Sequence, residues 1–390
     1  MRVCVASAGR FHAFDLARQM ARLGHLDQLY TAYPRFKVDG LPPDKVSTFP
    51  WLMGPAMFAA RLGFAGLQDR LNMSTIETFD RWMAARLEPC GVFHCLSQFG
   101  TYSHRTARER FGALCVCDRG SAHILYQDEI LRDECARMGA PYAGPDPRLV
   151  ARELAEYDIC DLIALPSRFS MQSFVEHGVP REKLRLVPYG VDLDMFRPLA
   201  KTDKVFRVIY AGAISIRKGV SYLLEAVAGA RIPGLETWLV GNVDPEMRPV
   251  LARYEGSFRH VPAVARQRLP EYYAQGSVFV IASIEEGLAL VQAQAMACGL
   301  PVIATTNSGA EDLFTDGVEG FIVPIRDAEA LREKIVFLYE HPEARERMAA
   351  AALDRVRSLG GWDDYGDRMA ACYQGALAAR DACLNANPLR

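Results

Sequence analysis

The stretch that most constrains the fold is residues 278–324, VFVIASIEEGLALVQAQAMACGLPVIATTNSGAEDLFTDGVEGFIVP. Residues 278–282 are a short apolar run rich in β-branched side chains, which predicts a buried parallel strand that ends just before Glu285 and Glu286. Residues 291–297 then predict a helix. Ligands bind where parallel strands end, and the N-terminus of a helix attracts phosphate through its free N–H groups and its dipole. The stretch therefore predicts an α/β fold with a site for a phosphate-bearing ligand such as a sugar nucleotide.

The same stretch has a characteristic spacing of polar residues. Glu286 is followed, after seven residues, by Gln294 on the predicted helix. In its strand, loop and helix register this resembles the donor-binding core of retaining GT-B glycosyltransferases, especially glycosyltransferase family 4, which has a Glu at both positions. The resemblance implies two Rossmann-like αβα domains that face each other across a cleft. The alternative is an αβ core with an incidental acidic loop.

The resemblance also implies a role for each matching residue. Glu286 would face the transferred sugar, and Gln294 would bind the ribose. Gln294 offers one carbonyl acceptor and one amide donor without a charge, so a working ribose contact is expected, with a weakened donor site as the alternative. Backbone amides of the turn between them would bind the diphosphate, namely those of Gly287, Leu288, Ala289 and Leu290.

Composition points to an ordinary globular enzyme. The 390 residues are enough for two domains, half of them are hydrophobic, and the net charge of -2 gives no nucleic-acid signal. The ten cysteines are scattered without a C-x-x-C pair, which predicts buried thiols in a reducing compartment. Neither a signal peptide nor a run of about 20 apolar residues is visible. We expect a cytoplasmic protein and leave open a peripheral association with the inner face of the membrane.

The N-terminal region opens with a strand over residues 2–6, a loop that contains Gly9 and His12, and an amphipathic helix over residues 13–23. This is the first unit of a doubly wound domain. In the GT-B pattern the first loop faces the cleft, and a small residue lets the backbone approach the donor phosphates. Gly9 is therefore predicted as a cleft residue, with an ordinary turn as the alternative. His12 is interpreted as a helix-start or acceptor-side residue.

Residues 41–87 mix aromatic side chains with arginines, among them Trp51, Phe58, Arg61 and Trp82. Such a pattern is typical of helices packed on their own domain with arginines toward solvent. It also fits an acceptor groove or a face that lies on a membrane. The resemblance places acceptor recognition in this domain but selects no acceptor.

A second loop of this domain follows a strand predicted over residues 113–117. The family carries a His-Asp pair at the end of this strand, near the transferred sugar, whereas this chain has Cys117 and Asp118. His123 is therefore the candidate for the cleft histidine, with a structural histidine as the alternative. Arg119 is a candidate partner for an anionic group.

The connection between the domains also resembles the family. Gly190, Val191 and Asp192, followed by Phe196 and Pro198, match its interdomain turn. The predicted domains are residues 1–199, on the acceptor side, and residues 200–364, which bind the nucleotide sugar. A C-terminal helix over residues 365–390 is predicted to cross back to the first domain.

The second domain supplies the predicted cations. After a strand over residues 206–211, the family has an Arg and a Lys that neutralise the diphosphate. Lys218 matches the Lys, Ala213 replaces the Arg, and the neighbouring Arg217 is expected to substitute for it. A solvated surface pair is the alternative. A later loop places the backbone of Ala263 and Val264 beside the nucleotide base in the family.

The sequence therefore predicts transfer of a hexosyl group from a nucleoside diphosphate sugar to an acceptor hydroxyl, with retention of configuration. The acceptor is a glycan, a lipid-linked sugar or a small molecule. No metal and no cofactor are expected, because no His/Asp cluster has ligand spacing. A nucleotide-sugar epimerase of the same fold and a non-catalytic glycosyltransferase subunit are the alternatives.

Overall fold

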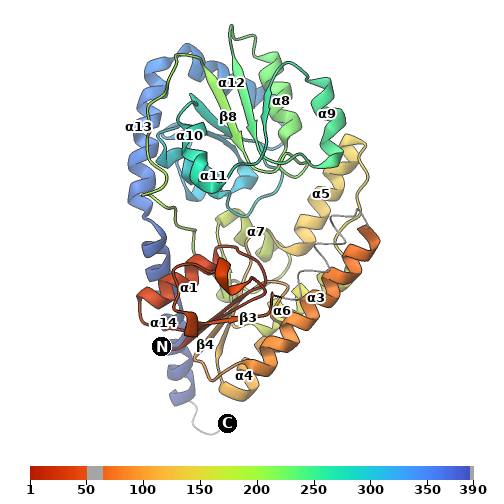
Figure 1. The fold of residues 1–390 in the computed structure, drawn as a ribbon, viewed down its shortest axis with the longest axis vertical. Coiled ribbons are helices and arrows are strands. Elements are labelled where there is room, and N and C mark those ends of the chain that lie inside the picture. Colours follow the sequence, from red (N-terminus) through yellow and green to blue (C-terminus); the bar gives the residue numbers. More distant parts are fainter. Residues whose placement is uncertain (51–64, 387–390) are drawn as a thin grey trace.

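The computed structural model describes residues 1–50 and 65–386. Two lobes lie one above the other, and each has a parallel sheet at its centre with helices on both faces (Figure 1). All paired strands in these residues run parallel. This arrangement confirms the prediction of two Rossmann-like αβα domains. Trp51, Phe58 and Arg61, part of the aromatic and basic pattern, lie outside the described residues.

The first sheet has seven strands in the order β3-β2-β1-β4-β5-β6-β7. Its central strands are buried on both faces, which explains their nearly continuous apolar sequences. The order reverses between β1 and β4, so the loops after these two strands lie at a switch point where ligands bind. The strands are β1 (Val3–Ser7), β2 (Leu26–Thr31), β3 (Val46–Thr48), β4 (Val92–Leu96), β5 (Leu114–Asp118), β6 (Leu162–Leu165) and β7 (Leu184–Leu186).

Helices cover both faces of this sheet. α1 buries Phe14 and Leu16 against it, as its amphipathic sequence predicts. Trp82 of α3 stacks on Phe49 at 5.2 Å and on Phe79 at 5.8 Å, so this part of the aromatic pattern packs on its own domain. The helices are α1 (Ala13–Arg22), α3 (Ala65–Arg86), α4 (Thr101–Phe111), α5 (Ile124–Met138), α6 (Pro147–Ile159) and α7 (Arg168–Glu176).

The second sheet has six strands in the order β10-β9-β8-β11-β12-β13. β11 lies between β8 and β12, and its four residues are fully buried, as predicted for the apolar run before Glu285. The strands are β8 (Arg207–Ala211), β9 (Glu236–Val240), β10 (Arg259–Val261), β11 (Val278–Ile281), β12 (Val302–Thr305) and β13 (Gly320–Val323).

Two features of the helices on this sheet were visible in the sequence. α11 begins at Leu290, directly after the acidic loop, and Asp327 caps α12 by accepting the N–H of Ala330 at 2.8 Å. The helices are α8 (Val220–Gly229), α9 (Arg248–Arg253), α10 (Leu269–Tyr273), α11 (Leu290–Ala297), α12 (Ala328–Glu340) and α13 (Pro342–Leu359).

The C-terminal helix α14 (Trp362–Ala386) runs from the second lobe down along the first (Figure 1). It packs against α1, and its Tyr365 and Tyr373 are fully buried in the core of the first lobe. The chain changes sheets between β7 and β8. The domain limits at residues 199 and 364 stay predictions.

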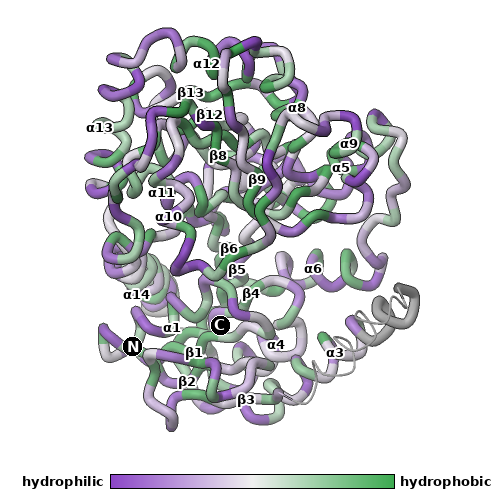
Figure 2. The backbone as a smooth tube through the Cα atoms, turned by 45° about the horizontal axis from the view of Figure 1, so that its top comes forward, coloured by the Kyte–Doolittle hydropathy of each residue, from purple (hydrophilic) through white to green (hydrophobic). Residues whose placement is uncertain are grey.

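Hydropathy follows the layers, because the strands inside each lobe are the most apolar segments and the outer helices are largely polar (Figure 2). Eight of the ten cysteines are buried in these cores. In the described residues, no helix is both long and apolar enough to span a bilayer.

Candidate functional site

The loops at the carboxyl ends of the two sheets meet between the lobes and leave three cavities. The central pocket, of about 500 Å³, is bordered by both lobes. The outer pocket, of about 840 Å³, lies beside the start of α11, and a small pocket of about 250 Å³ lies at the ends of β8 and β9. Their main lining residues are His12, Asp118, Tyr189, Arg217 and Glu286 for the central pocket, Arg10, Asp192, Arg266, Leu290 and Gln294 for the outer pocket, and Gly212, Ala213, Asn242, Ala263 and Val264 for the small pocket.

The predicted cations Arg217 and Lys218 lie in contact with the predicted acid Glu286. The Nζ of Lys218 forms an ion pair with the carboxylate of Glu286, and the guanidinium of Arg217 lies 3.7 Å from the same carboxylate. Burial and the charge of Arg217 lower the pKa of Lys218 to about 7, while Glu285 acts in the opposite direction. The structure thus brings these three predicted residues together, with Glu286 paired to Lys218 and close to Arg217.

Glu285, which the sequence did not single out, links the two lobes. Its fully buried carboxylate accepts hydrogen bonds from the Ser121 hydroxyl at 2.6 Å, the Ala122 N–H at 3.0 Å and the Gln127 amide at 2.8 Å. Arg217 of its own lobe lies 3.3 Å away. Burial raises the pKa of this carboxyl, but Arg217 and the donors from Ser121 and Ala122 outweigh burial, so its pKa is lowered overall.

Two glycines allow the close approach of backbone that this junction needs. A Cβ on Gly287 would collide with the carbonyl oxygen of Gly120 on the other lobe. Gly219, at φ +60°, precedes α8, and a Cβ there would collide with the carbonyl oxygen of Ala282. Any side chain at Gly287 would therefore push the lobes apart.

The predicted amides lie at the start of α11, but one of them is engaged. Ala289 donates its N–H to the carbonyl of Ser308 at 3.2 Å, so this predicted donor is not free to bind a ligand in this structure. Leu290 lines the outer pocket, Leu288 lines the central pocket, and Gly287 forms the junction with Gly120. The helix start thus lies beside the outer pocket, and Leu288, two residues earlier, lies at the central pocket.

Gln294 and the two predicted base neighbours lie on successive parts of the cleft. Gln294 lines the outer pocket, and its Oε1 accepts a hydrogen bond from the Tyr273 hydroxyl at 3.3 Å. Ala263 and Val264 line the small pocket together with Ala213. Ala213 thus places a small uncharged side chain at this pocket, where the family has the cationic side chain of an Arg.

His123 does not reach any of these cavities. It is buried within the first lobe, where it stacks on His177 at 4.5 Å and its Nδ1 accepts the N–H of Leu125 as the cap of α5. Burial lowers its pKa to about 3. The structure thus corrects the prediction that His123 lines the sugar site, because the residues after Asp118 turn back into the lobe to begin α5.

The structure also places Arg119 differently from its prediction as a partner for an anionic group. Arg119 is buried, and its guanidinium is bound by Glu153 at 3.0 Å and Gln127 at 2.9 Å, so it supports the loop rather than offering a free cation. The central pocket instead presents His12, whose Nε2 lies 2.6 Å from the Asp118 carboxylate. No spacing in the sequence predicted this pair, because the two residues are 106 positions apart.

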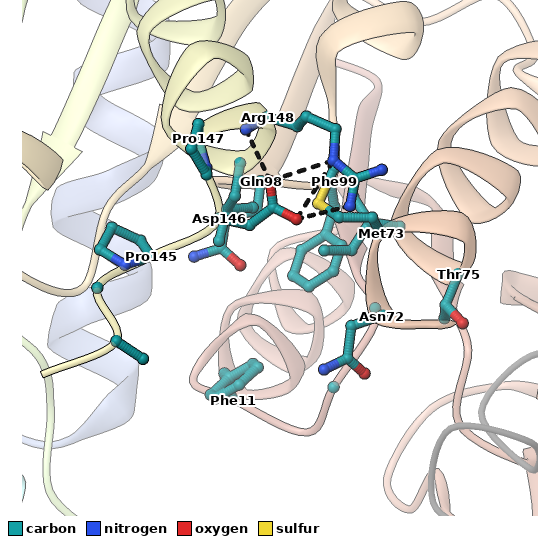
Figure 3. Close-up of a pocket in the computed structure, with 16 residues that line it drawn as sticks. Phe11, Asn72, Met73, Thr75, Gln98, Phe99, Pro145, Asp146, Pro147 and Arg148 are labelled. Carbon is teal, nitrogen blue, oxygen red and sulfur yellow. Dashed lines mark hydrogen bonds and ion pairs between the residues drawn. The ribbon is translucent and has the colours of Figure 1, made fainter. Parts of the chain in front are cut away.

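Gly9 lines a further cavity, the N-terminal groove, of about 810 Å³. Figure 3 shows Phe11, Phe99 and Met73 around the same space, with Asp146 and Arg148 joined above them. Phe11, Gln98 and Phe99 line both this groove and the central pocket, so the two spaces are neighbours. Gly9 is therefore a residue of the N-terminal groove, and the nearby Phe11 lines this groove as well as the central and outer pockets. In the part of the chain that the structure describes, no group of three or more His, Cys, Asp or Glu residues is arranged to hold a metal.

Comparisons with known proteins agree with this geometry. The profile of the family described as glycosyl transferases group 1 matches residues 205–341, which include both acids and both cations. Sucrose-phosphate synthase from Thermosynechococcus elongatus superposes with a TM-score of 0.73 at 20% identity, over 97% of this chain and 100% of that one. Anabaena HepE in complex with UDP-glucose superposes with a TM-score of 0.66 at 15% identity, over 96% and 100% of the two chains. The fold is thus GT-B.

The second lobe, at residues 205–341, is thus similar to the glycosyl transferases group 1 family. A D-inositol 3-phosphate glycosyltransferase from Xylanimonas cellulosilytica is 28% identical over 272 residues, which cover 62% of this chain and 64% of that protein. A similarly named protein from Catenulispora acidiphila is 26% identical over 301 residues, 71% of this chain and 72% of that protein. The match thus spans about two thirds of these relatives.

Proposed function

We propose that the protein transfers a hexosyl group from a nucleoside diphosphate sugar to an acceptor hydroxyl, with retention of configuration. The observation that carries the proposal is the junction of Arg217, Lys218 and Glu286 beside the start of α11, at the carboxyl edge of the second sheet. Cations and a helix N-terminus at one place suit a diphosphate. In this proposal the base occupies the small pocket, and the ribose contacts Gln294.

The proposed chemistry follows from where charge develops. As the glycosidic bond breaks, the departing diphosphate gains negative charge, and Arg217 and Lys218 stabilise it more strongly in the transition state than in the ground state. The acceptor hydroxyl approaches on the same face of the sugar, and a diphosphate oxygen takes its proton, which retains the configuration. Glu286 orients the sugar in this scheme. The fixed loops that meet at Gly287 exclude water from the reacting atoms.

The acceptor is proposed to extend from the central pocket into the N-terminal groove, because the two share Phe11, Gln98 and Phe99 as lining residues. The groove is lined mainly by apolar side chains, namely Phe11, Met73, Ile76, Phe99, Pro145, Pro147 and Leu149. Its charged lining residues, Asp146 and Arg148, bond to each other at 2.6 Å. These features favour an acceptor with an uncharged apolar part over a phosphorylated polyol.

An assay of donor use tests this function. We expect the purified protein to bind and turn over one of a panel of nucleoside diphosphate sugars, beginning with UDP-glucose, and to keep its activity in EDTA. Octyl β-glucoside is expected to accept the sugar better than inositol phosphate, and proton NMR should find the new bond in the anomeric configuration of the donor. An inverted product would refute the retaining reaction. Donor binding without release of the nucleoside diphosphate in any condition would instead favour a non-catalytic subunit.

Gln294 is expected to affect donor binding rather than the chemical step. A ribose contact is the same before and during the reaction, so Gln294→Ala should raise the donor KM by roughly 2- to 13-fold, about 0.5–1.5 kcal/mol, with kcat nearly unchanged. Gln294→Glu should preserve or tighten binding, because a carboxylate still accepts from Tyr273 and also from a diol. Steady-state kinetics of both variants check this, and an unchanged KM in Gln294→Ala would place the ribose elsewhere.

A further inference from the structure

Four side chains from four elements form a chain of hydrogen bonds that leads from the cleft into the first lobe. His12, at the start of α1, and His94, on β4, both bring Nε2 to the same Oδ2 of Asp118, at 2.6 Å and 2.9 Å. The hydroxyl of Tyr373 on α14 then lies 2.7 Å from Nδ1 of His94. His94, Asp118 and Tyr373 are buried, whereas His12 lines both the central and the outer pocket.

These hydrogen bonds determine which ring nitrogen of each histidine carries the hydrogen. Burial raises the pKa of Asp118, but the two histidines hold it well below its usual value, so the carboxylate is ionised and can only accept. Both histidines therefore carry their hydrogen on Nε2, and the Tyr373 hydroxyl donates to Nδ1 of His94. In neutral His12 this leaves Nδ1 as a hydrogen-bond acceptor.

The ring of His12 is also held in place. It packs against the ring of Tyr189 at 4.2 Å between centroids, and the side chain is only 8% exposed. A ring fixed by a buried carboxylate and an aromatic neighbour offers its second nitrogen in one direction, as histidines that act on substrates do.

We propose that His12 binds a substrate hydroxyl through Nδ1, and that Asp118, His94 and Tyr373 are positioning residues for it. The inference rests on the proposed function, since the hydroxyl belongs either to the acceptor or to the transferred sugar. It assigns to His12 the contact that the sequence had suggested for His123. It also connects the crossing helix to the site, because the Tyr373 hydroxyl donates to Nδ1 of His94 and so helps to hold this ring.

Two substitutions of His12 distinguish the contributions of its two ring nitrogens. The amide of His12→Asn reaches the position of Nδ1, whereas the amide of His12→Gln reaches the position of Nε2 and keeps only the bond to Asp118. We measure UDP binding, release of UDP from UDP-glucose in water, and transfer to octyl β-glucoside. Both variants should bind UDP like the wild type, which also shows that they fold. His12→Gln should lose at least tenfold in turnover, and His12→Asn should retain more.

The pattern of loss identifies the hydroxyl. A fall in transfer that exceeds the fall in hydrolysis assigns it to the acceptor, and equal falls assign it to the transferred sugar. Tyr373→Phe, which removes only the far hydroxyl, should give a smaller loss of the same pattern. Wild-type rates in His12→Gln would overturn the inference. If the wild type binds neither UDP nor UDP-glucose and no other nucleotide sugar replaces them, the proposed function fails instead.

Discussion

Replacing Glu285 with alanine is expected to destabilise the protein by about 1–3 kcal/mol, the usual effect of leaving buried hydrogen-bond donors without an acceptor. The carboxylate is fully buried and holds Ser121, Ala122 and Gln127 of the first lobe to Arg217 of the second. Without it, the buried N–H of Ala122 loses its acceptor, and the half-buried guanidinium of Arg217 loses one of its two carboxylate neighbours. Thermal unfolding should show the loss, and small-angle X-ray scattering should show a more open molecule. The donor KM should also rise, because Arg217 is no longer held at the central pocket.

Glu134 provides a matched control for this prediction. It is another fully buried carboxylate between the lobes, and it accepts from Tyr222 at 2.8 Å and from Arg326 at 2.6 Å. Glu134→Ala should destabilise the protein similarly but leave the donor KM nearly unchanged, because its partners do not line the central pocket. Equal kinetic effects of both variants would show that Glu285 acts only on stability.

The same carboxylate predicts a dependence of stability on pH. Its pKa is lowered in the folded protein, so its contribution is present above the ordinary carboxyl pKa of about 4.3 and is lost as the pH falls through the folded value. The difference in stability between wild type and Glu285→Ala should therefore shrink in acid.

Much of the fold could be predicted because its signals are local. The apolar run of β11, the helix that begins near Leu290, and the cap at Asp327 each follow from a few neighbouring residues. β2 and β3 were missed, because residues 26–31 and 46–48 mix polar and apolar side chains in short strands near the edge of the sheet. α14 begins at Trp362, three residues before the predicted start at residue 365, and it packs on α1 of the first lobe as the predicted crossing requires.

The site was predictable in the second lobe and only partly in the first. Arg217, Lys218 and Glu286 lie on two loops of one sheet, so the order of strands is enough to bring them together. His12 and Asp118 meet only through the register of β1, β4 and β5, and no spacing in the sequence encodes their contact. Glu285 was not predicted as a site residue, because its neighbour Glu286 is the acid that fits the family pattern. Two adjacent acids at the end of a strand could nevertheless have suggested a different role for each.

Glu286 interacts with Arg217 and Lys218, the two cations that are proposed to bind the donor diphosphate. Its carboxylate pairs with Lys218 and lies 3.7 Å from Arg217, and it is only 15% exposed. A diphosphate that binds Arg217 and Lys218 must therefore displace this carboxylate, or share the cations with it. In the proposed reaction, Glu286 then turns its oxygens to hydroxyls of the transferred sugar.

Glu286→Ala should consequently strengthen the binding of UDP and lower kcat. Removal of the competing carboxylate should tighten the binding of UDP by up to about fivefold, the range of a partly exposed ion pair. Loss of a charged hydrogen bond to the sugar in the transition state should lower kcat by roughly 10- to 150-fold, about 1.5–3 kcal/mol. Calorimetric titration with UDP and kinetics with the donor measure the two effects.

Glu286→Gln is the control that separates charge from hydrogen bonding. The amide keeps an acceptor for a sugar hydroxyl but no longer neutralises Lys218, so it should show the tighter UDP binding of Glu286→Ala with a smaller loss of kcat. Lys218→Ala should act in the opposite direction on binding, since it removes a cation instead of its competitor. If Glu286→Ala weakens UDP binding, the carboxylate supports the diphosphate site rather than competing for it, because it then holds Lys218 in the orientation that the diphosphate requires.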